Sequence, residues 1–204
     1  MVITKNRQSN ETIFGMAKMA FPDKQVEKIK ELPEGMCNVT YDITFEDGSE
    51  SILKIAAKDR RGNTSNEVNL MRAEINAMKL VVENCSFKVA DVQYYDTSNT
   101  ICDGNYFFME KLEGDNFFSV RKDMSEEEIA IIDTEIGKIS RELSNIQNSE
   151  FGFLGEDTKY HSLTGHVFPS QSPASPLHCQ RQSCHSQLLQ EVLSKYRFHT
   201  PNLK

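Results

Sequence analysis

Lys54 is the residue whose position in the sequence most directly suggests ligand chemistry. It lies between Leu53 and Ile55, inside the otherwise apolar segment I-L-K-I-A of residues 52–56. An ammonium group held close to a buried sheet loses hydration, and its charge then needs a compensating partner. A phosphate group would be such a partner. A strand with one solvent face and one core face would also account for the lysine, and for a lone lysine that is the commoner explanation.

Gly35 and Glu74 are two further residues that could contact the same ligand. Gly35 stands just before a predicted strand, where a residue without a Cβ lets the backbone lie close against a bound group. Glu74 lies at the edge of a predicted helical stripe, three residues after Met71 and four before Met78, so its carboxylate could point inward toward the sheet. A glutamate at such a boundary is usually solvated, so the spacing alone leaves its role open.

A β-hairpin is the element that must hold Lys54. Two runs of strand-forming residues, 37–45 and 51–56, are joined by Glu46-Asp47-Gly48. An acidic residue followed by glycine between two such runs is a strong hairpin signal. Residues 26–32, which precede the hairpin, fit either a helix or a first strand.

A helix is expected to carry Glu74. After a charged loop at residues 58–66, apolar side chains recur at spacings of three and four, which is typical of an amphipathic helix, and Ser65 or Asn66 is the expected N-cap. The apolar positions of this helix are Val68, Met71, Ile75, Met78 and Val82.

Two more strands are predicted at residues 89–95 and 105–110, separated by a polar turn. Phe107 and Phe108 in the second of these strands fit a core better than a binding site. The strand runs into F-F-M-E-K-L-E-G, residues 107–114, which is apolar and then abruptly polar with a glycine. A sheet edge that leads into a flexible crossing exposes backbone groups, and these could meet a flat ligand.

A long amphipathic helix is predicted after Ser125. The segment S-E-E-E, residues 125–128, has the pattern of a capping box with acids in the first turn. Apolar residues then follow at three-and-four spacing, at Ile129, Ile132, Ile136, Ile139, Leu143 and Ile146. Such a stripe must be buried, and without its usual cover it would allow self-association.

The charge and the cysteine pattern argue against several classes of protein. The formal net charge of −7 argues against general affinity for nucleic acids or anionic membranes. No apolar leader follows Met1 and no run of about 18 apolar residues is present, so neither secretion nor membrane spanning is expected. The five cysteines do not cluster, and a reducing cytoplasm is the expected location.

The composition changes after Tyr160. Residues 161–204 contain four of the 23 Lys and Arg residues, one of the 30 Asp and Glu residues, and all five histidines. Three interpretations compete for this tail: a truncated or frame-shifted gene product, a linker with a terminal helix at 188–196, or a zinc site at 178–185. The first two are compatible with each other, whereas the zinc site lacks a second ligand pair at a regular spacing.

Taken in order, these motifs resemble those of a known family. Gly35 and Asn38 at the opening of a hairpin, I-L-K-I-A with Lys54, a helix carrying Glu74, and F-M-E-K-L-E-G are similar to the N-terminal lobe of the aminoglycoside phosphotransferase and choline kinase group. The resemblance spans residues 27–155. It implies a kinase-like α+β fold with a five-stranded antiparallel sheet and one large helix, followed by the start of a helical second lobe and an atypical tail.

The resemblance also implies a domain organisation. The N-terminal lobe would comprise residues 1–112, and a hinge with the first helix of an incomplete second lobe would comprise residues 113–157. The polar tail would comprise residues 158–204.

Four residues are implied in binding the phosphates of ATP. Lys54 would hold the phosphates and pair with Glu74, and this would also account for the buried charge. The turn from Gly35 to Asn38 would cover the phosphates, although it is not glycine-rich as in protein kinases.

Three residues are implied in binding the base. Met109 would line the pocket, and backbone groups of Glu110 and Leu112 would hydrogen-bond the adenine edge.

The sequence departs from the family where the second lobe should carry the catalytic groups. A loop of the type H-G-D-x-x-x-x-N, whose Asp acts on the acceptor hydroxyl, is missing, as is the later acid that holds magnesium. Phosphoryl transfer depends on metal charge and a positioned acceptor. The sequence therefore predicts a relative of ATP-dependent small-molecule phosphotransferases with absent or very low turnover and no assigned catalytic or metal-binding residue. The acceptor, whether an aminoglycoside, choline or a sugar, stays open, and the alternative is a non-catalytic nucleotide-binding or interaction module.

Overall fold

The computed structural model describes residues 5–33, 38–57, 70–115 and 117–146. The chain divides into two compact units, Met1–Met71 with Ala90–Lys111, and Arg72–Val89 with Leu112–Lys204. Each unit has its own core within these residues. No helix among the described residues is both long enough and apolar enough for a membrane span.

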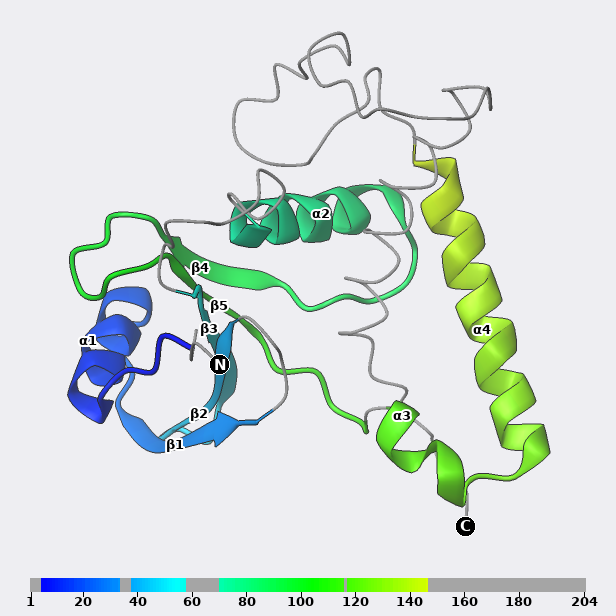
Figure 1. The fold of residues 1–204 in the computed structure, drawn as a ribbon, viewed down its shortest axis with the longest axis horizontal. Helices are drawn as coiled ribbons and strands as arrows, with labels where there is room; N and C mark the ends of the chain where they lie inside the picture. Colours follow the sequence, from blue (N-terminus) through cyan, green and yellow to red (C-terminus); the bar gives the residue numbers. More distant parts are fainter. Residues whose placement is uncertain (1–4, 34–37, 58–69, 116, 147–204) are drawn as a thin grey trace, which may run out of the picture. The chain divides into compact units, whose positions relative to one another are not determined.

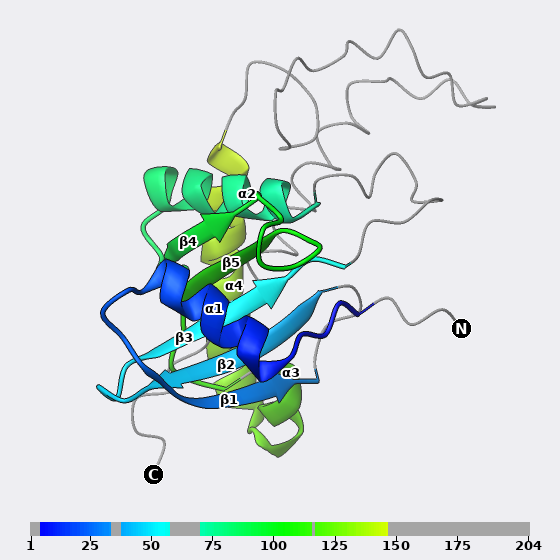
Figure 2. The ribbon, with the colours of Figure 1, turned by 90° about the vertical axis from the view of Figure 1, so that its left-hand side faces the viewer.

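The first unit is built on a five-stranded antiparallel sheet (Figures 1 and 2). Its strand order is β1-β2-β3-β5-β4, and the predicted fold class is confirmed. The strands are β1 (Val26–Leu32), β2 (Val39–Phe45), β3 (Glu50–Ile55), β4 (Val92–Asp96) and β5 (Tyr106–Glu110). Residues 26–32, which fitted either a helix or a strand in the sequence analysis, form the strand β1. This strand pairs with β2 at the edge of the sheet.

The predicted hairpin joins β2 to β3. Side chains along β2 alternate between buried and half-buried, as expected for a strand with one face on a core. Gly48 has φ +78°, a left-handed conformation that glycine adopts without a steric penalty. The acidic residue and the glycine at the turn thus predicted its position correctly.

One face of the sheet is covered by α1 (Asn10–Ala20), as Figure 2 shows. Ser9 caps this helix, because its hydroxyl accepts a hydrogen bond from the N–H of Thr12 at 3.2 Å. The buried side chains between α1 and the sheet form the α1-side core: Ile13, Met16, Ala17, Val39, Tyr41, Ile43, Phe45, Leu53, Ile55, Cys102, Tyr106 and Phe108.

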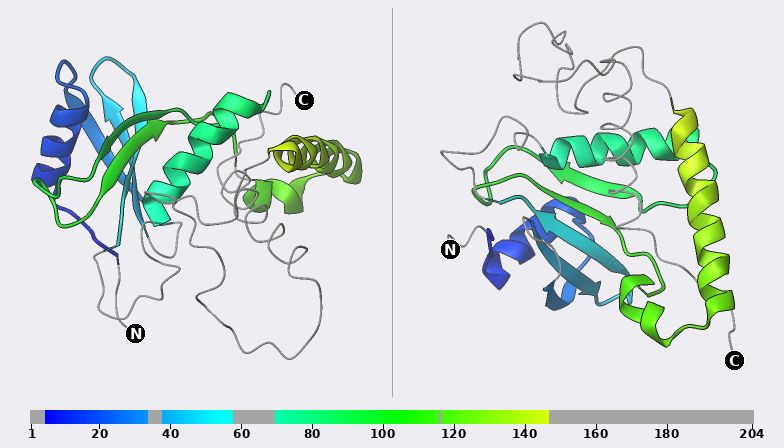
Figure 3. Two further views of the ribbon diagram at one scale, coloured as in Figure 1. Left: turned by 90° about the horizontal axis from the view of Figure 1, so that it is seen from above. Right: turned by 45° about the vertical axis from the view of Figure 1, so that its right-hand side comes forward.

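The second unit contains most of α2 (Leu70–Asn84), the short α3 (Phe117–Val120), a 3-10 turn (Arg121–Asp123) and the long α4 (Glu126–Asn145) (Figure 3). A core of Ala77, Val81, Val89, Ile139 and Leu143 packs α2 against α4.

The apolar stripe of α2 differs by one position from the prediction. Val82 was expected to be buried, yet it is 51% exposed, and the buried residue is Val81. Ala77, which was not assigned to the stripe, is buried as well. It packs in the core shared with α4, so the buried face of α2 is rotated slightly from the predicted one. The expected N-caps, Ser65 and Asn66, lie outside the described residues.

Candidate functional site

Lys54 lies at the centre of the sheet face opposite the α1-side core. Its neighbours Leu53 and Ile55 both belong to that core, so strand alternation directs the Lys54 side chain to the second face. Its register partners are Thr40 on β2 and Phe107 on β5. Lys54 as a whole is half-buried.

The next row of the same face is formed by Ile52 with its register partners Asp42 and Met109. Ile52 and Met109 are each only 8% exposed, and neither belongs to the α1-side core. Two predicted site residues, Lys54 and Met109, therefore lie on one face in adjacent rows. A cation beside an apolar row suits a molecule that joins phosphate groups to a flat base.

A cluster of three charged residues lies at the end of these rows. The ammonium of Lys111, directly after β5, donates to Oδ2 of Asp42 at 2.9 Å and to Oε1 of Glu50 at 2.6 Å. Partial burial alone would lower the pKa of Lys111, but the hydrogen bonds and charges of Glu50 and Asp42 outweigh it, so the pKa is raised. Lys111 is therefore a cation at neutral pH.

Of the two carboxylate oxygens of Asp42, only Oδ2 accepts a hydrogen bond from the described residues. Its Oδ1 is buried and accepts no hydrogen bond from the described residues. A buried carboxylate oxygen without a donor is unfavourable, so this part of the face is polar and under-satisfied.

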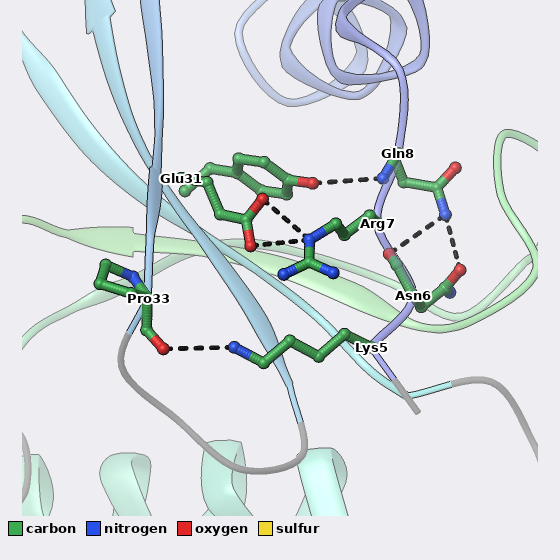
Figure 4. Close-up of polar contacts among 7 residues, drawn as sticks. Lys5, Asn6, Arg7, Gln8, Glu31 and Pro33 are labelled. Carbon is green, nitrogen blue, oxygen red and sulfur yellow. Dashed lines mark hydrogen bonds and ion pairs between the residues drawn. The ribbon is translucent and has the colours of Figure 1, made fainter. Parts of the chain in front are cut away.

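Two predicted phosphate-binding residues lie between β1 and β2 in the sequence. Asn38 is half-buried just before β2, and Gly35 lies outside the described residues. Figure 4 shows that the N-terminal segment contacts the end of β1. Lys5 donates to the carbonyl of Pro33 at 3.2 Å, and Arg7 pairs with Glu31 at 2.9 Å.

The remaining predicted residues fall on either side of the division between the units. Glu110 ends β5 in the first unit, whereas Leu112 and Glu74 belong to the second. Glu74 is 6% exposed, so it is more deeply buried than a residue at the edge of the helical stripe. Its pairing with Lys54 stays a prediction.

The sequence analysis assigned no role to Asp42, Glu50 or Lys111. Lys111 is separated from Asp42 by 69 residues and from Glu50 by 61, so no local sequence pattern predicts that these side chains are in contact. The only local signal was that Asp42 is the single charged residue of V-T-Y-D-I-T-F in β2.

Metal ligands do not cluster in the part of the chain that the structure describes. No group of three or more His, Cys, Asp or Glu residues there could hold a metal ion. The two described cysteines, Cys85 and Cys102, are not joined in a disulfide, and the predicted zinc-binding cysteines of the tail lie outside the described residues.

The sequence matches no model of a protein family and no curated protein. Solved structures do resemble it. One is the GDP complex of wild-type aminoglycoside 2'-phosphotransferase-IIIa, with a TM-score of 0.54 and 15% identity, covering 69% of this chain and 43% of that one. Another is the GDP and kanamycin complex of APH(2")-IIIa, with a TM-score of 0.50 and 16% identity, covering 65% of this chain and 41% of that one.

The chain thus spans less than half of the length of these phosphotransferases. The match lies in the N-terminal part of the chain, where the sequence predicted the resemblance. In its N-terminal part the chain has the kinase-like fold of the aminoglycoside phosphotransferases.

Proposed function

We propose that this chain binds a purine nucleotide, with ATP as the expected ligand, on the sheet face that carries Lys54. The observation that supports the proposal is the placement of Lys54 on the face opposite α1, one row from the apolar pair Ile52 and Met109. The similar phosphotransferases include complexes with GDP, which is the same chemical class of ligand.

The phosphates would be bound by Lys54, with Glu74 as the carboxylate that orients its ammonium group and the Gly35 to Asn38 turn above them. When bound, the nucleotide would bring the γ-phosphate as the transferable group. The chain's own contribution is the cation and the backbone that surround it.

The base would lie against Met109, with its edge toward the backbone of the hinge. The N–H of Glu110 already donates to the carbonyl of Asp91 at 2.9 Å. The hydrogen-bonding groups proposed for the base are therefore the carbonyl of Glu110 and the N–H of Leu112.

The parent activity would be transfer of a phosphoryl group to a hydroxyl of a small molecule such as an aminoglycoside, choline or a sugar. This chain lacks the H-G-D-x-x-x-x-N loop and the later magnesium-binding acid. Without a positioned acceptor and metal charge, the largest sources of rate enhancement are missing. We therefore propose that the chain binds nucleotide but turns over very slowly or not at all.

Titration with ATP and Mg²⁺ by isothermal calorimetry tests the binding. Lys54→Ala should weaken the affinity about 10- to 100-fold, because charge-assisted hydrogen bonds are worth about 1.5–3 kcal/mol. Lys28→Ala, which removes an exposed strand lysine from β1, is the control and should leave the affinity unchanged. Equal affinity in wild type and Lys54→Ala would favour a non-catalytic interaction module that does not use this face.

A coupled assay of ADP release with kanamycin or choline tests the second half of the proposal. No release above the rate without acceptor is expected. Turnover that depends on the acceptor would show that this chain carries catalytic groups outside the H-G-D-x-x-x-x-N pattern.

A further inference from the structure

Neither the fold nor the family resemblance assigns a function to Lys111 and its two carboxylate partners. We name the trio Lys111, Asp42 and Glu50 the hinge clamp. We infer that the hinge clamp positions the hinge backbone for the base of the nucleotide, an inference that rests on the function proposed above.

The hinge clamp joins three parts of the first unit. Asp42 lies on β2, Glu50 begins β3, and Lys111 is the first residue of the segment that leaves β5. The ammonium group is held at 2.9 Å by one carboxylate and at 2.6 Å by the other. A lysine with acceptors on two different strands loses most of its rotamer freedom, so the peptide that carries it is fixed as well.

The end of β5 is held from its other side too. The N–H of Glu110 donates to the carbonyl of Asp91, which lies just before β4. The peptide between Glu110 and Lys111 therefore lies between two fixed points, the Asp91 carbonyl and the hinge clamp. The carbonyl of this peptide is the group proposed to accept a hydrogen bond from the base.

Stability alone does not account for the hinge clamp. Its side chains are 31% (Lys111), 17% (Asp42) and 42% (Glu50) exposed, and ion pairs at such positions contribute little. Oδ1 of Asp42 is also left buried without a donor, which is unfavourable. Apolar residues would join the strands at least as well, whereas the charged trio fixes one geometry.

Binding of adenosine and of ATP to Lys111→Met, Lys111→Arg, Lys54→Ala and wild type, measured by isothermal calorimetry, tests the inference. Lys111→Met should weaken adenosine and ATP by the same factor, about 5- to 10-fold, because the base contact is common to both ligands. Lys111→Arg should restore most of the affinity, since it keeps a cation between the two acids. Lys54→Ala should weaken ATP and leave adenosine unchanged.

Lys24→Met is the matched control. Lys24 is 34% exposed, lies in the same unit and pairs with Asp47 at 3.1 Å, so its loss removes a comparable ion pair at the β2–β3 turn that contains no residue of the hinge clamp. If Lys111→Met and Lys24→Met change the affinities equally, the hinge clamp has only a structural role. Urea unfolding of both variants shows whether they remain folded at the temperature of the titration.

The failure of this inference differs from the failure of the proposed function. If wild type binds ATP in a manner that depends on Lys54, but Lys111→Met binds both ligands as wild type does, only the positioning role is overturned. If wild type binds neither ligand, the nucleotide site and the hinge clamp's role in it are both wrong.

Discussion

Gly104 lies where the chain turns into β5, with no room for a side chain. Its φ of +142° is unfavourable for any L-residue with a Cβ, and a Cβ there would lie 2.9 Å from Nδ2 of Asn6 and 3.3 Å from the carbonyl of Ala56. Asn6 is fully buried and donates to the carbonyl of Asp103 at 2.6 Å, so it cannot move aside without losing that bond. The N-terminal segment and this turn are therefore fitted to each other.

Gly104→Ala should lower the free energy of unfolding by about 2–4 kcal/mol, because it combines an unfavourable φ with a steric clash. Gly15→Ala in α1 is the control: its Cβ would meet Ile101 Cγ2 at an ordinary 3.7 Å, so helix propensity should raise stability by about 0.5–1 kcal/mol. Urea unfolding followed by circular dichroism measures both. Equal effects of the two substitutions would contradict the fit between Asn6 and Gly104.

Asp47 in the β2–β3 turn should make stability depend on acid pH. Hydrogen bonds from the hydroxyl and the N–H of Ser49, together with Lys24, lower its pKa from 3.8 to about 2. A carboxyl group with a lower pKa in the folded state contributes stability above its unfolded pKa and loses it as the pH falls through its folded pKa. The window of loss is therefore from about pH 4 to pH 2.

Asp47→Asn should accordingly unfold at lower urea than wild type at pH 5, and the difference should shrink between pH 4 and pH 2. The measurement is the urea midpoint of both proteins at pH 5, 3 and 2. A difference that stays constant over this range would show that the Asp47 charge does not contribute.

At the scale of the element, α4 begins with the capping box that its sequence predicts. Oγ of Ser125 accepts from the N–H of Glu128 at 3.2 Å, and a carboxylate oxygen of Glu128 accepts from the N–H of Ser125 at 2.7 Å. The helix then buries Ile132, Ile139 and Leu143, which all belong to the predicted stripe.

Ser125→Ala should lower the free energy of unfolding of the second unit by about 1 kcal/mol, since it leaves a helix N–H without its acceptor. Ser144→Ala, in the last turn of the same helix, removes a hydroxyl that only donates to the carbonyl of Arg141 and should change stability by less than about 0.5 kcal/mol. Thermal unfolding by circular dichroism distinguishes them. A Ser144→Ala effect as large as that of Ser125→Ala would mean that the cap is not the cause.

Elements with local signals could be predicted from the sequence, and those that depend on distant partners could not. The acidic residue before Gly48 and the S-E-E-E segment of α4 act within a few residues, and both predictions are confirmed. Residues 26–32 carry no comparable signal, because an edge strand alternates only weakly and takes its conformation from pairing with β2. Val81 rather than Val82 is buried because of the direction from which α4 packs. The sequence of α2 alone does not reveal that direction.

The candidate site divides in the same way. Lys54 was singled out from its own segment and Met109 only through the family resemblance; the register places both on one face, and their role in binding stays a prediction. The hinge clamp could not be foreseen, because it depends on the register of β2, β3 and β5 together. Glu74 is more deeply buried than its position on the stripe indicates, and its role in the site stays a prediction.

At the scale of the whole chain, the two units have separate cores among the described residues. The α1-side core contains Ile43, and the α2–α4 core contains Leu143. The predicted stripe of α4 thus has part of its cover in α2, while Ile131, outside the stripe, is 62% exposed. Self-association stays a prediction.

Leu143→Ala should destabilise α2 and α4 by about 2–5 kcal/mol, because it removes a fully buried side chain from their shared core. Hydrogen exchange measured by mass spectrometry should therefore rise more in these helices than in β2 and β3. Ile43→Ala should give the reverse pattern. The same pattern of exchange in both variants would show that the two units unfold as one.

Glu142 of α4 also binds the segment that directly follows α2, through polar contacts. Its carboxylate accepts from the N–H of Ser86 at 2.6 Å and from the Ser86 hydroxyl at 2.8 Å, which lowers the pKa of Glu142.

β1 forms one margin of the sheet, and in the described part of the chain no other strand pairs with its outer side. The exposed residues there include Glu27, Lys28 and Lys30. Unpaired strand margins tend to recruit strands of other molecules, and alternating charges at such a margin oppose this. A protein with these charges exchanged for threonine would be expected to form fibrils more readily, even though its folded core would be untouched.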